Sequence, residues 1–140
     1  MRAIAEKAGI GVLAAANFSL GMNVFQLAVE EASRHFANHA EFGGWIHESH
    51  HVMKKDAPSG TAISLKNGME QAGYSRPIDV SSTRVGVVPG THTVGFDGPS
   101  ETIEFTHTVR DRAVFARGAL TAARWLVGRR GWFSIRDLLS

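Results

Sequence analysis

The sequence contains no cysteine among its 140 residues. This absence excludes disulfides, thiolate zinc sites and cysteine nucleophiles, and it fits a reducing compartment. Long apolar runs are also missing: the longest, residues 10–16, has Gly11 inside it and is far too short to cross a membrane. The first residues lack the extended apolar core of a signal peptide. We therefore expect a cytoplasmic protein that does not associate with membranes.

An excess of charge of one sign is lacking as well. The chain has 15 Lys and Arg against 13 Asp and Glu, so its formal net charge is only +2, although its pI is near 9.4. Basic residues are spread out apart from the pairs 54–55 and 129–130, whereas nucleic-acid-binding proteins usually gather them in a patch or stripe. We expect no nucleic-acid partner. The apolar fraction of 44% is that of an ordinary globular protein.

Hydrophobic periodicity divides the chain into helices and strands. Helices are predicted over residues 2–8, 20–37, 59–71 and 112–127, the last with Phe115, Ala119, Ala122 and Leu126 on one face. Strands are predicted over residues 10–16 (short and buried), 40–48, 80–88, 91–97 and 101–109. The apolar tail, residues 131–139, needs something to pack on. The pattern predicts an α+β fold, with a mixed, largely antiparallel sheet covered by helices.

The beginning of the chain is unusual for a complete domain. A helix without a cap leads directly into a buried strand, and nothing upstream can supply that strand with a neighbour. We expect the chain to begin in the middle of a domain. Residues 9–14 also fit G-x-G-x-x-A, but a dinucleotide fingerprint needs a strand before the first glycine and a helix after the last. The order here is reversed, which indicates a helix stop and a turn.

Residues 46–62, IHESHHVMKKDAPSGTA, hold most of the candidate chemistry. His47, Glu48 and His51 match H-E-x-x-H, in which a helix places two histidines on one face to bind zinc. The glycines at 43–44 and the following Asp-Ala-Pro turn argue against a helix, and the Lys54 ammonium would repel a dication. We therefore expect no metal. A plain polar loop remains a second interpretation.

A third interpretation is an anion-binding catalytic loop. Lys54 supplies a positive charge, and the free N–H groups where Ser59, Gly60 and Thr61 open a helix can bind a carboxylate or phosphate. His50 or His51 can donate or carry a proton near neutral pH. This combination suits a small dicarboxylate that is protonated during the reaction. The residues alone do not choose between the two histidines.

Residues 48–62, ESHHVMKKDAPSGTA, resemble the signature E-x-H-H-x-x-K-x-D-A-P-S-G-T-A of the 4-hydroxy-tetrahydrodipicolinate reductases, also called dihydrodipicolinate reductases. The motif is long, and every fixed position is filled. Three other segments resemble the same family: residues 15–21 (AANFSLG), 88–92 (VPGTH) and 115–119 (FARGA). The resemblance covers nearly the whole chain.

The resemblance implies a cytoplasmic enzyme of lysine and diaminopimelate biosynthesis. Such an enzyme transfers hydride from NADPH or NADH to a cyclic unsaturated dicarboxylate, giving tetrahydrodipicolinate. The implied catalytic residues are His50 as proton donor and Lys54. The implied ligand-binding residues are His51, Ser59, Gly60 and Thr61 for the substrate, and Ala15, Ala16, Asn17 and Phe18 for the nicotinamide. The family also implies a homotetramer whose interfaces are built by the sheet.

One departure from the family concerns the nucleotide-binding domain, whose Gly-rich loop and G-T-T-G segment are missing here. We expect residues 1–19 to be the end of that domain, residues 20–112 the substrate-binding and oligomerisation domain, and residues 113–140 a helix and tail that pack back on the absent part. The chain would be inactive alone as a fragment, would be completed by a nucleotide-binding chain in a split enzyme, or would be a non-catalytic dicarboxylate-binding or assembly module.

Overall fold

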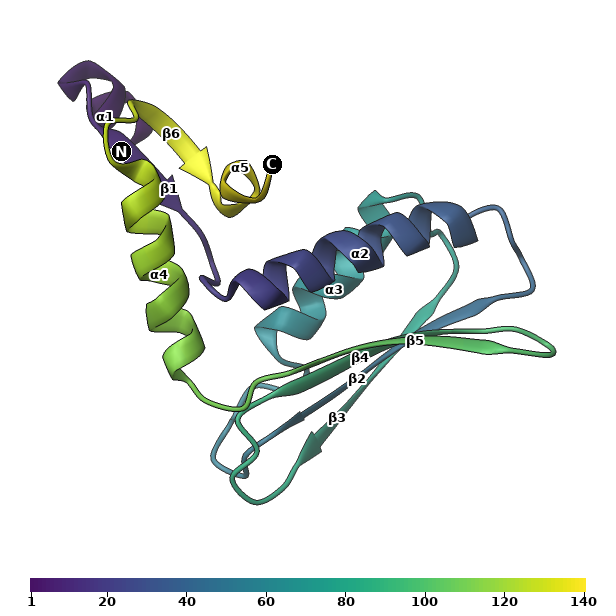
Figure 1. Ribbon diagram of the computed structural model, residues 1–140. Coiled ribbons are helices and arrows are strands. Elements are labelled where there is room, and N and C mark those ends of the chain that lie inside the picture. The colour runs from purple at the N-terminus through teal and green to yellow at the C-terminus, as the bar shows by residue number, and fades with distance from the viewer. The chain divides into compact units, whose positions relative to one another are not determined.

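The computed structural model describes residues 1–140, which form helices, a two-stranded sheet and a four-stranded sheet (Figure 1). The elements are α1 (Arg2–Ala8), β1 (Gly11–Ala14), α2 (Leu20–Phe36), β2 (Gly43–His50), α3 (Gly60–Gln71), β3 (Ile78–Arg84), β4 (Thr91–Asp97), β5 (Thr102–Thr108), α4 (Ala113–Leu126), β6 (Gly131–Ser134) and α5 (Ile135–Leu139). Two compact units result. Unit 1 combines Met1–Val24 with Asp111–Ser140, and unit 2 is Phe25–Arg110. No helix is both long and apolar enough to cross a membrane.

Unit 2 is built on the four-stranded sheet, in the order β3-β2-β4-β5. β2 pairs with β3 in parallel, and the other two pairs are antiparallel. α2 and α3 lie over one face of this sheet (Figure 1). The predicted α+β fold with a mixed, largely antiparallel sheet is therefore confirmed. The predicted strands 40–48 and 80–88 are shifted: β2 extends two residues further, to His50, and β3 ends at Arg84.

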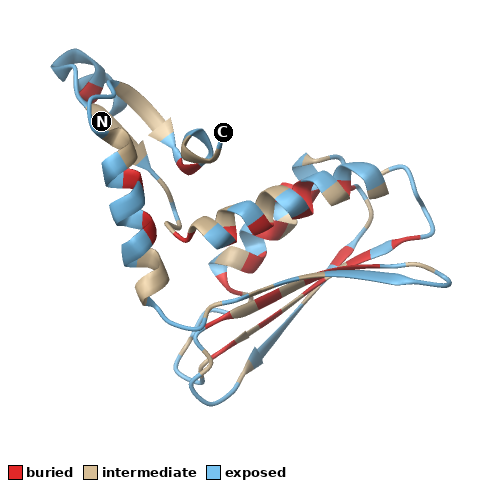
Figure 2. Ribbon diagram, viewed as in Figure 1, coloured by how far each residue is buried: buried red, intermediate tan, exposed pale blue.

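Alternation along the strands separates a buried face from a more open one. On β2 the residues Ile46, Glu48 and His50 are buried, whereas their immediate neighbours are only half-buried. Figure 2 shows the buried positions alternating along the sheet. The buried face continues onto β4, where buried His92 lies opposite Glu48 and buried Val94 lies opposite Ile46. The buried face is thus polar towards one end of the sheet and apolar towards the other.

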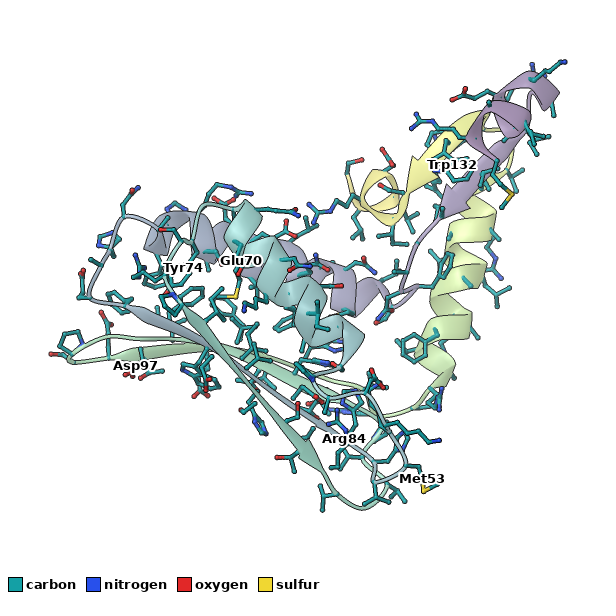
Figure 3. The ribbon with its side chains drawn as sticks, turned by 180° about the vertical axis from the view of Figure 1, so that it is seen from behind. Met53, Glu70, Tyr74, Arg84, Asp97 and Trp132 are labelled. Atoms are coloured by element: carbon teal, nitrogen blue, oxygen red, sulfur yellow. The ribbon has the colours of Figure 1, made fainter.

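The apolar end is closed by aromatic packing. Phe36 of α2 stacks on Phe96 of β4 with ring centroids 4.5 Å apart, and Tyr74 meets Phe96 edge-on. The Tyr74 hydroxyl donates to the carbonyl of Phe42, which satisfies the only polar atom of this fully buried side chain. Figure 3 shows Tyr74 and Asp97 at one end of the sheet, and Arg84 with Met53 at the other. The core therefore leaves the Arg84 end for polar groups.

The start of α3 follows from its sequence. Ser59 is the N-cap, and its Oγ accepts the Ala62 N–H at 3.1 Å, which satisfies one of the unpaired first-turn amides. The helix ends at Gln71, and Gly73 then turns the chain with φ +102°. The predicted helix over residues 59–71 is confirmed to within one residue.

Unit 1 corrects two predictions. The strand expected to be buried over residues 10–16 is β1, Gly11–Ala14, and it is only half-buried. Its single partner is β6, which pairs with it in parallel so that Gly11 lies opposite Gly131. β6 and α5 occupy the tail to which no secondary structure was assigned from sequence. α1 ends at Gly9, whose φ of +64° makes it a left-handed C-cap, so Gly9 is the predicted helix stop.

The second correction concerns α4, in which Ala119 is exposed rather than on the packed face. The buried residues are Gly118 and Ala122. The stripe is displaced because the helix approaches the segment before α2 very closely at Gly118. A Cβ built there would lie 1.7 Å from the Phe18 carbonyl oxygen.

Gly118→Ala is therefore expected to destabilise unit 1 by about 2 kcal/mol, since the clash is with backbone that cannot rotate away. Alanine is the better helix former, so propensity alone would predict the opposite sign. Urea unfolding followed by circular dichroism measures the change. Ala119→Val, which adds volume at the exposed neighbouring position, is the matched control. Equal stability of Gly118→Ala and the wild type would contradict the contact.

Candidate functional site

The carboxylate of Glu48 lies at the centre of the polar end of unit 2. Glu48 is fully buried, and Arg84 of β3 binds it with both guanidinium nitrogens, Nη1 to Oε2 at 2.9 Å and Nη2 to Oε1 at 2.7 Å. His50 Nδ1 lies 2.5 Å from Oε2. The backbone N–H of Ser59 donates to Oε1 at 3.1 Å. One carboxylate therefore joins β2, β3 and the start of α3.

This environment keeps Glu48 ionised. Burial alone would raise the pKa of Glu48, but hydrogen bonds from the side chains of Arg84, Ser82 and His50 and from the Ser59 backbone lower it to about 2. The Arg84 fork is the largest of these opposing influences. At neutral pH the site therefore contains a buried carboxylate paired with a guanidinium.

Arg84 also holds the loop that follows β2. Its Nη2 donates to the carbonyl oxygen of Asp56 at 2.6 Å, in addition to its bond to Glu48. Two backbone bonds secure the beginning of the same loop, from Val85 N–H to His50 O and from Val52 N–H to Gly86 O. The loop that carries Lys54 is thereby fixed to the same guanidinium as the buried carboxylate.

His50 lies at the end of β2 with its side chain 11% exposed. Its ring meets that of His92 edge-on, with centroids 5.1 Å apart. Gly90 lies against its other nitrogen: a Cβ at Gly90 would be 3.0 Å from His50 Nε2. Gly90 has φ +150°, a backbone conformation that residues other than glycine rarely adopt. The glycine therefore leaves room beside Nε2.

His92 is buried and neutral at physiological pH. Burial, and then the charge of His50, lowers its pKa from 6.5 to about 4. Its Nε2 lies 2.9 Å from Ser59 Oγ, whereas its Nδ1 is buried without a hydrogen-bond partner. His107, its cross-strand neighbour on β5, also has its pKa lowered by burial. His92 therefore supports the N-cap of α3 as an uncharged group.

Lys54 lies in the loop, with its ammonium paired to Asp56. Nζ is 2.8 Å and 2.9 Å from the two carboxylate oxygens, and this hydrogen bond lowers the pKa of Asp56. The Asp56 side chain is 59% exposed and that of Lys54 is 23% exposed. Ion pairs at such exposure are screened by solvent and contribute little to stability. The Asp56 side of this ion pair is therefore open to solvent.

The other predicted substrate residues lie around this loop. Gly60 and Thr61 form the first turn of α3, directly after Ser59, where amide groups have no helical acceptor. His51 is half-buried, and its imidazole makes no hydrogen bond or ion pair. Its carbonyl accepts the N–H of Lys54 at 3.1 Å. His50 and the Ser59 N–H both hydrogen-bond to the Glu48 carboxylate. Lys54 is connected to this carboxylate only through its loop, whose Asp56 carbonyl accepts a hydrogen bond from Arg84.

The H-E-x-x-H pattern falls on a strand and a loop instead of a helix. His47 and Glu48 are consecutive on β2, so they point to opposite faces of the sheet. His47 Nδ1 lies 2.8 Å from Ser81 Oγ on the open face. The structure has no group of three or more histidine, cysteine, aspartate or glutamate side chains arranged to hold a metal ion.

The predicted nicotinamide residues belong to unit 1 and follow β1. Asn17 is held at the N-terminus of α2: its Oδ1 accepts the Ser19 N–H at 2.8 Å, and Asn23 Nδ2 donates to its carbonyl at 2.9 Å. Ala15 and Phe18 are half-buried, and Ala16 is exposed. This segment follows the carboxyl end of β1, which is the edge of a parallel sheet where ligands of open α/β sheets bind.

Sequence reasoning missed Arg84, His92 and Asp56 as members of the site, and it gave Glu48 no role. A signal for Glu48 existed, because residues two apart on a strand share a face, so Glu48 and His50 had to lie side by side once β2 was extended. Arg84 had no comparable signal. Its partner is distant in the sequence, and a single arginine at the end of a polar strand resembles an ordinary surface residue.

Comparison with known proteins gives a consistent result. The family model described as "Dihydrodipicolinate reductase, C-terminus" matches residues 21–139. The 4-hydroxy-tetrahydrodipicolinate reductase of Stenotrophomonas maltophilia (strain R551-3) is 46% identical over 139 residues, which cover 96% of this chain and 55% of the relative. The 4-hydroxy-tetrahydrodipicolinate reductase of Thermosipho africanus is 37% identical over 134 residues, which cover 93% of this chain and 57% of the relative. The chain thus spans about half the length of these curated relatives.

The fold also has a counterpart among solved structures. A dipicolinate-bound dihydrodipicolinate reductase from Paenisporosarcina sp. TG-14 superposes with a TM-score of 0.81 at 20% sequence identity. The match covers 95% of this chain and 56% of that one. Its low identity limits its meaning to the fold.

Proposed function

Since the chain belongs to the dihydrodipicolinate reductase family, we propose that it supplies the substrate-binding and proton-donating half of a reductase of lysine and diaminopimelate biosynthesis. In the proposed reaction a cyclic dihydrodipicolinate-type dicarboxylate gains a hydride and a proton and becomes tetrahydrodipicolinate. The ring is reduced by the two electrons that the hydride carries, and the hydride donor is oxidised by the same two electrons. The protein must therefore hold two carboxylates and deliver one proton.

The observation that carries this proposal is the sharing of Glu48 by His50 and the start of α3. It supports placing a proton donor beside a helix N-terminus, whose first amides favour a bound carboxylate. Lys54 adds a cation whose present partner, Asp56, is exposed and replaceable. We assign His50 as the proton donor and Lys54 as the second catalytic group. His51, Ser59, Gly60 and Thr61 are assigned to the substrate carboxylates.

The cofactor that fits this proposal is NADPH or NADH, which when bound supplies the hydride. Ala15, Ala16, Asn17 and Phe18 are assigned to the nicotinamide end: they follow the carboxyl end of β1, and the first two present little side-chain bulk there. The G-x-G-x-x-A segment does not form the strand-turn-helix that binds a diphosphate, because Gly9 caps α1 and Gly11 begins β1. We therefore propose that cofactor binding depends on a nucleotide-binding part beyond this chain, as in a longer reductase or a split enzyme.

The open face of the unit 2 sheet supports the proposal of a homotetramer. Threonines of β4 and β5 pair across this face, Thr91 with Thr108 and Thr93 with Thr106. α2 and α3 both lie on the opposite face (Figure 1). A sheet face without covering helices needs either a solvated surface or a partner, and a second copy of the same sheet would supply the latter.

Lys54→Ala is expected to weaken binding of pyridine-2,6-dicarboxylate, a substrate-like anion, at least tenfold, because the variant lacks the ammonium that would pair with a ligand carboxylate in place of Asp56. Isothermal titration calorimetry on the full chain measures the affinity. The matched control is Lys55→Ala, which removes an exposed neighbouring lysine and should change affinity less than threefold. Unchanged binding by Lys54→Ala would remove Lys54 from the site, and equal losses in both variants would indicate unspecific attraction.

A reductase assay with NADPH and NADH completes this test. Dicarboxylate binding without turnover supports a substrate half that requires a nucleotide-binding part, and turnover restored by such a part would identify a split enzyme. Binding with no turnover under any reconstitution would favour a non-catalytic dicarboxylate-binding module. Absence of binding by the wild type would contradict the proposed function.

A further inference from the structure

We propose that Glu48, held by Arg84, is a positioning residue that accepts the Nδ1–H of His50 and so reserves the opposite nitrogen, Nε2, for proton donation to substrate. This inference rests on the proposed function, in which His50 is the donor. It adds which nitrogen of His50 donates the proton and which residue fixes the tautomer of the imidazole. Glu48 itself need not touch the substrate.

The arrangement decides the tautomer of His50. An ionised carboxylate can only accept hydrogen bonds, so the nitrogen 2.5 Å from Oε2 must carry a hydrogen. Glu48 is fully buried and has Arg84 and the Ser59 amide on its remaining positions, so water does not compete for it. Neutral His50 therefore carries its hydrogen on Nδ1. The proton gained on becoming imidazolium is on Nε2.

Arg84 gives the carboxylate a second property. A free carboxylate beside an imidazolium could take the proton itself, but the guanidinium fork stabilises the ionised form of Glu48. The proton therefore stays on the imidazole. Carboxylates that orient a histidine in this way, without becoming protonated, are a recurring device in proton-transfer sites.

The surroundings of Nε2 agree with this assignment. Gly90 has no side chain there, and a Cβ would lie 3.0 Å from Nε2. The other ionisable groups at this end of unit 2 are Arg84 on β3, His92 on β4, and the Lys54–Asp56 pair in the loop after β2. Arg84 is engaged by Glu48, and His92 is neutral. Neither competes for the proton at Nε2.

Glu48 also sets the position of the donor relative to the anion-binding helix. Oε2 faces His50, and Oε1 accepts the Ser59 N–H that precedes the first turn of α3. Both hydrogen bonds end on one rigid planar group. During the proposed step the Nε2–H bond breaks, its proton joins the substrate ring, and His50 is left neutral with its hydrogen on Nδ1. Solvent then reprotonates Nε2.

Long-range ¹H–¹⁵N correlation spectra of the ¹⁵N-histidine-labelled full chain, recorded where the imidazoles are neutral, test this directly. His50, identified by its absence in His50→Gln, is expected to be the Nδ1–H tautomer in the wild type. The Nε2–H tautomer in the wild type would overturn the proposal without any variant. His47 on the opposite face of β2 is an internal control, because Glu48 variants should leave its spectrum unchanged.

Two variants separate positioning from simple stabilisation. Glu48→Gln removes the charge and is expected to give a mixture of His50 tautomers, whereas Glu48→Asp restores the Nδ1–H form at least in part. If Glu48→Gln does not fold, Arg84→Lys is measured instead, and it should retain the Nδ1–H form because the carboxylate remains. A pure Nδ1–H signal in Glu48→Gln, or its loss in Arg84→Lys, would contradict the role given to Glu48.

Titration of the wild type with pyridine-2,6-dicarboxylate distinguishes this inference from the proposed function on which it rests. Dicarboxylate binding by the wild type, together with its Nδ1–H tautomer, supports both. Dicarboxylate binding with the wrong tautomer overturns only the positioning role. The expected tautomer without any dicarboxylate binding by the wild type overturns the proposed function on which this inference depends.

Discussion

Arg84→Ala is expected to lower the free energy of unfolding by about 3–5 kcal/mol, which is the usual effect of removing one partner from a buried ion pair. The effect is large because the substitution leaves the Glu48 carboxylate buried without its cationic partner. Glu48 is fully buried, and without the guanidinium its charge would keep only the hydrogen bonds of its uncharged neighbours and of His50. The same substitution removes the bond from Arg84 to the Asp56 carbonyl, so the loop that carries Lys54 should loosen as well.

Urea unfolding at pH 7 measures this change. The matched control is Arg34→Ala, since Arg34 also pairs with a glutamate, Glu31, but both side chains are more than half exposed. Its effect should stay below about 1 kcal/mol. The double variant Glu48→Gln with Arg84→Ala should be more stable than the sum of the two single effects predicts, because it leaves no buried charge. Similar small losses at Arg84 and Arg34 would show that the buried pair contributes no more than a surface one.

Stability is expected to fall by about 3 kcal/mol as the pH is lowered from 6.5 to 4, because of His92. Its pKa is lowered by burial from 6.5 to about 4 in the folded protein. Between these values the unfolded chain binds a proton that the folded protein does not, so stability decreases as pH falls. The contribution is complete above pH 6.5 and is lost at pH 4. His107, whose pKa burial also lowers, acts in the same direction.

Thermal or urea unfolding across this pH range tests the assignment. His92→Gln should flatten the dependence between pH 6.5 and 4, whereas Thr93→Ser, on the open face of the same strand, should leave it unchanged. Glu48 acts in a different window. Since its pKa falls from 4.5 to about 2 on folding, its contribution is present above pH 4.5 and is lost below it. A profile for His92→Gln identical to that of the wild type would contradict the role of His92.

The helices could be predicted because their signals are local. Ser59 followed by a helical run identified the start of α3, and Gly9 identified the end of α1. The strand order could not be predicted in the same way. β2 lies between β3 and β4, which come later in the chain, and pairing between distant segments leaves no mark in either segment alone. β6 was missed because four residues of an apolar tail show too little alternation to be distinguished from coil.

The site residues show the same difference between local signals, which could be predicted, and contacts between distant segments, which could not. The resemblance to a family motif supplied His50, Lys54 and the residues that open α3, all within one continuous stretch. The groups contributed by β3 and β4 were not predicted as site residues, although His92 lies in a segment that resembles the family, since Arg84 and His92 reach the site only through the register of the sheet. The roles of the motif residues stay predictions. What the structure adds is the buried carboxylate that connects them.

The discontinuity of unit 1 has an energetic consequence. Its two segments are joined only through Phe25–Arg110, the whole of unit 2, so pairing β1 with β6 in an otherwise unfolded chain requires closing a very long loop. Such closure is opposed by an entropy on the order of 4 kcal/mol. Phe25 and His107, near the two ends of unit 2, are in contact, with ring centroids 5.9 Å apart. A folded unit 2 therefore closes most of this loop in advance, and the stability of the small parallel sheet depends on the folding of unit 2.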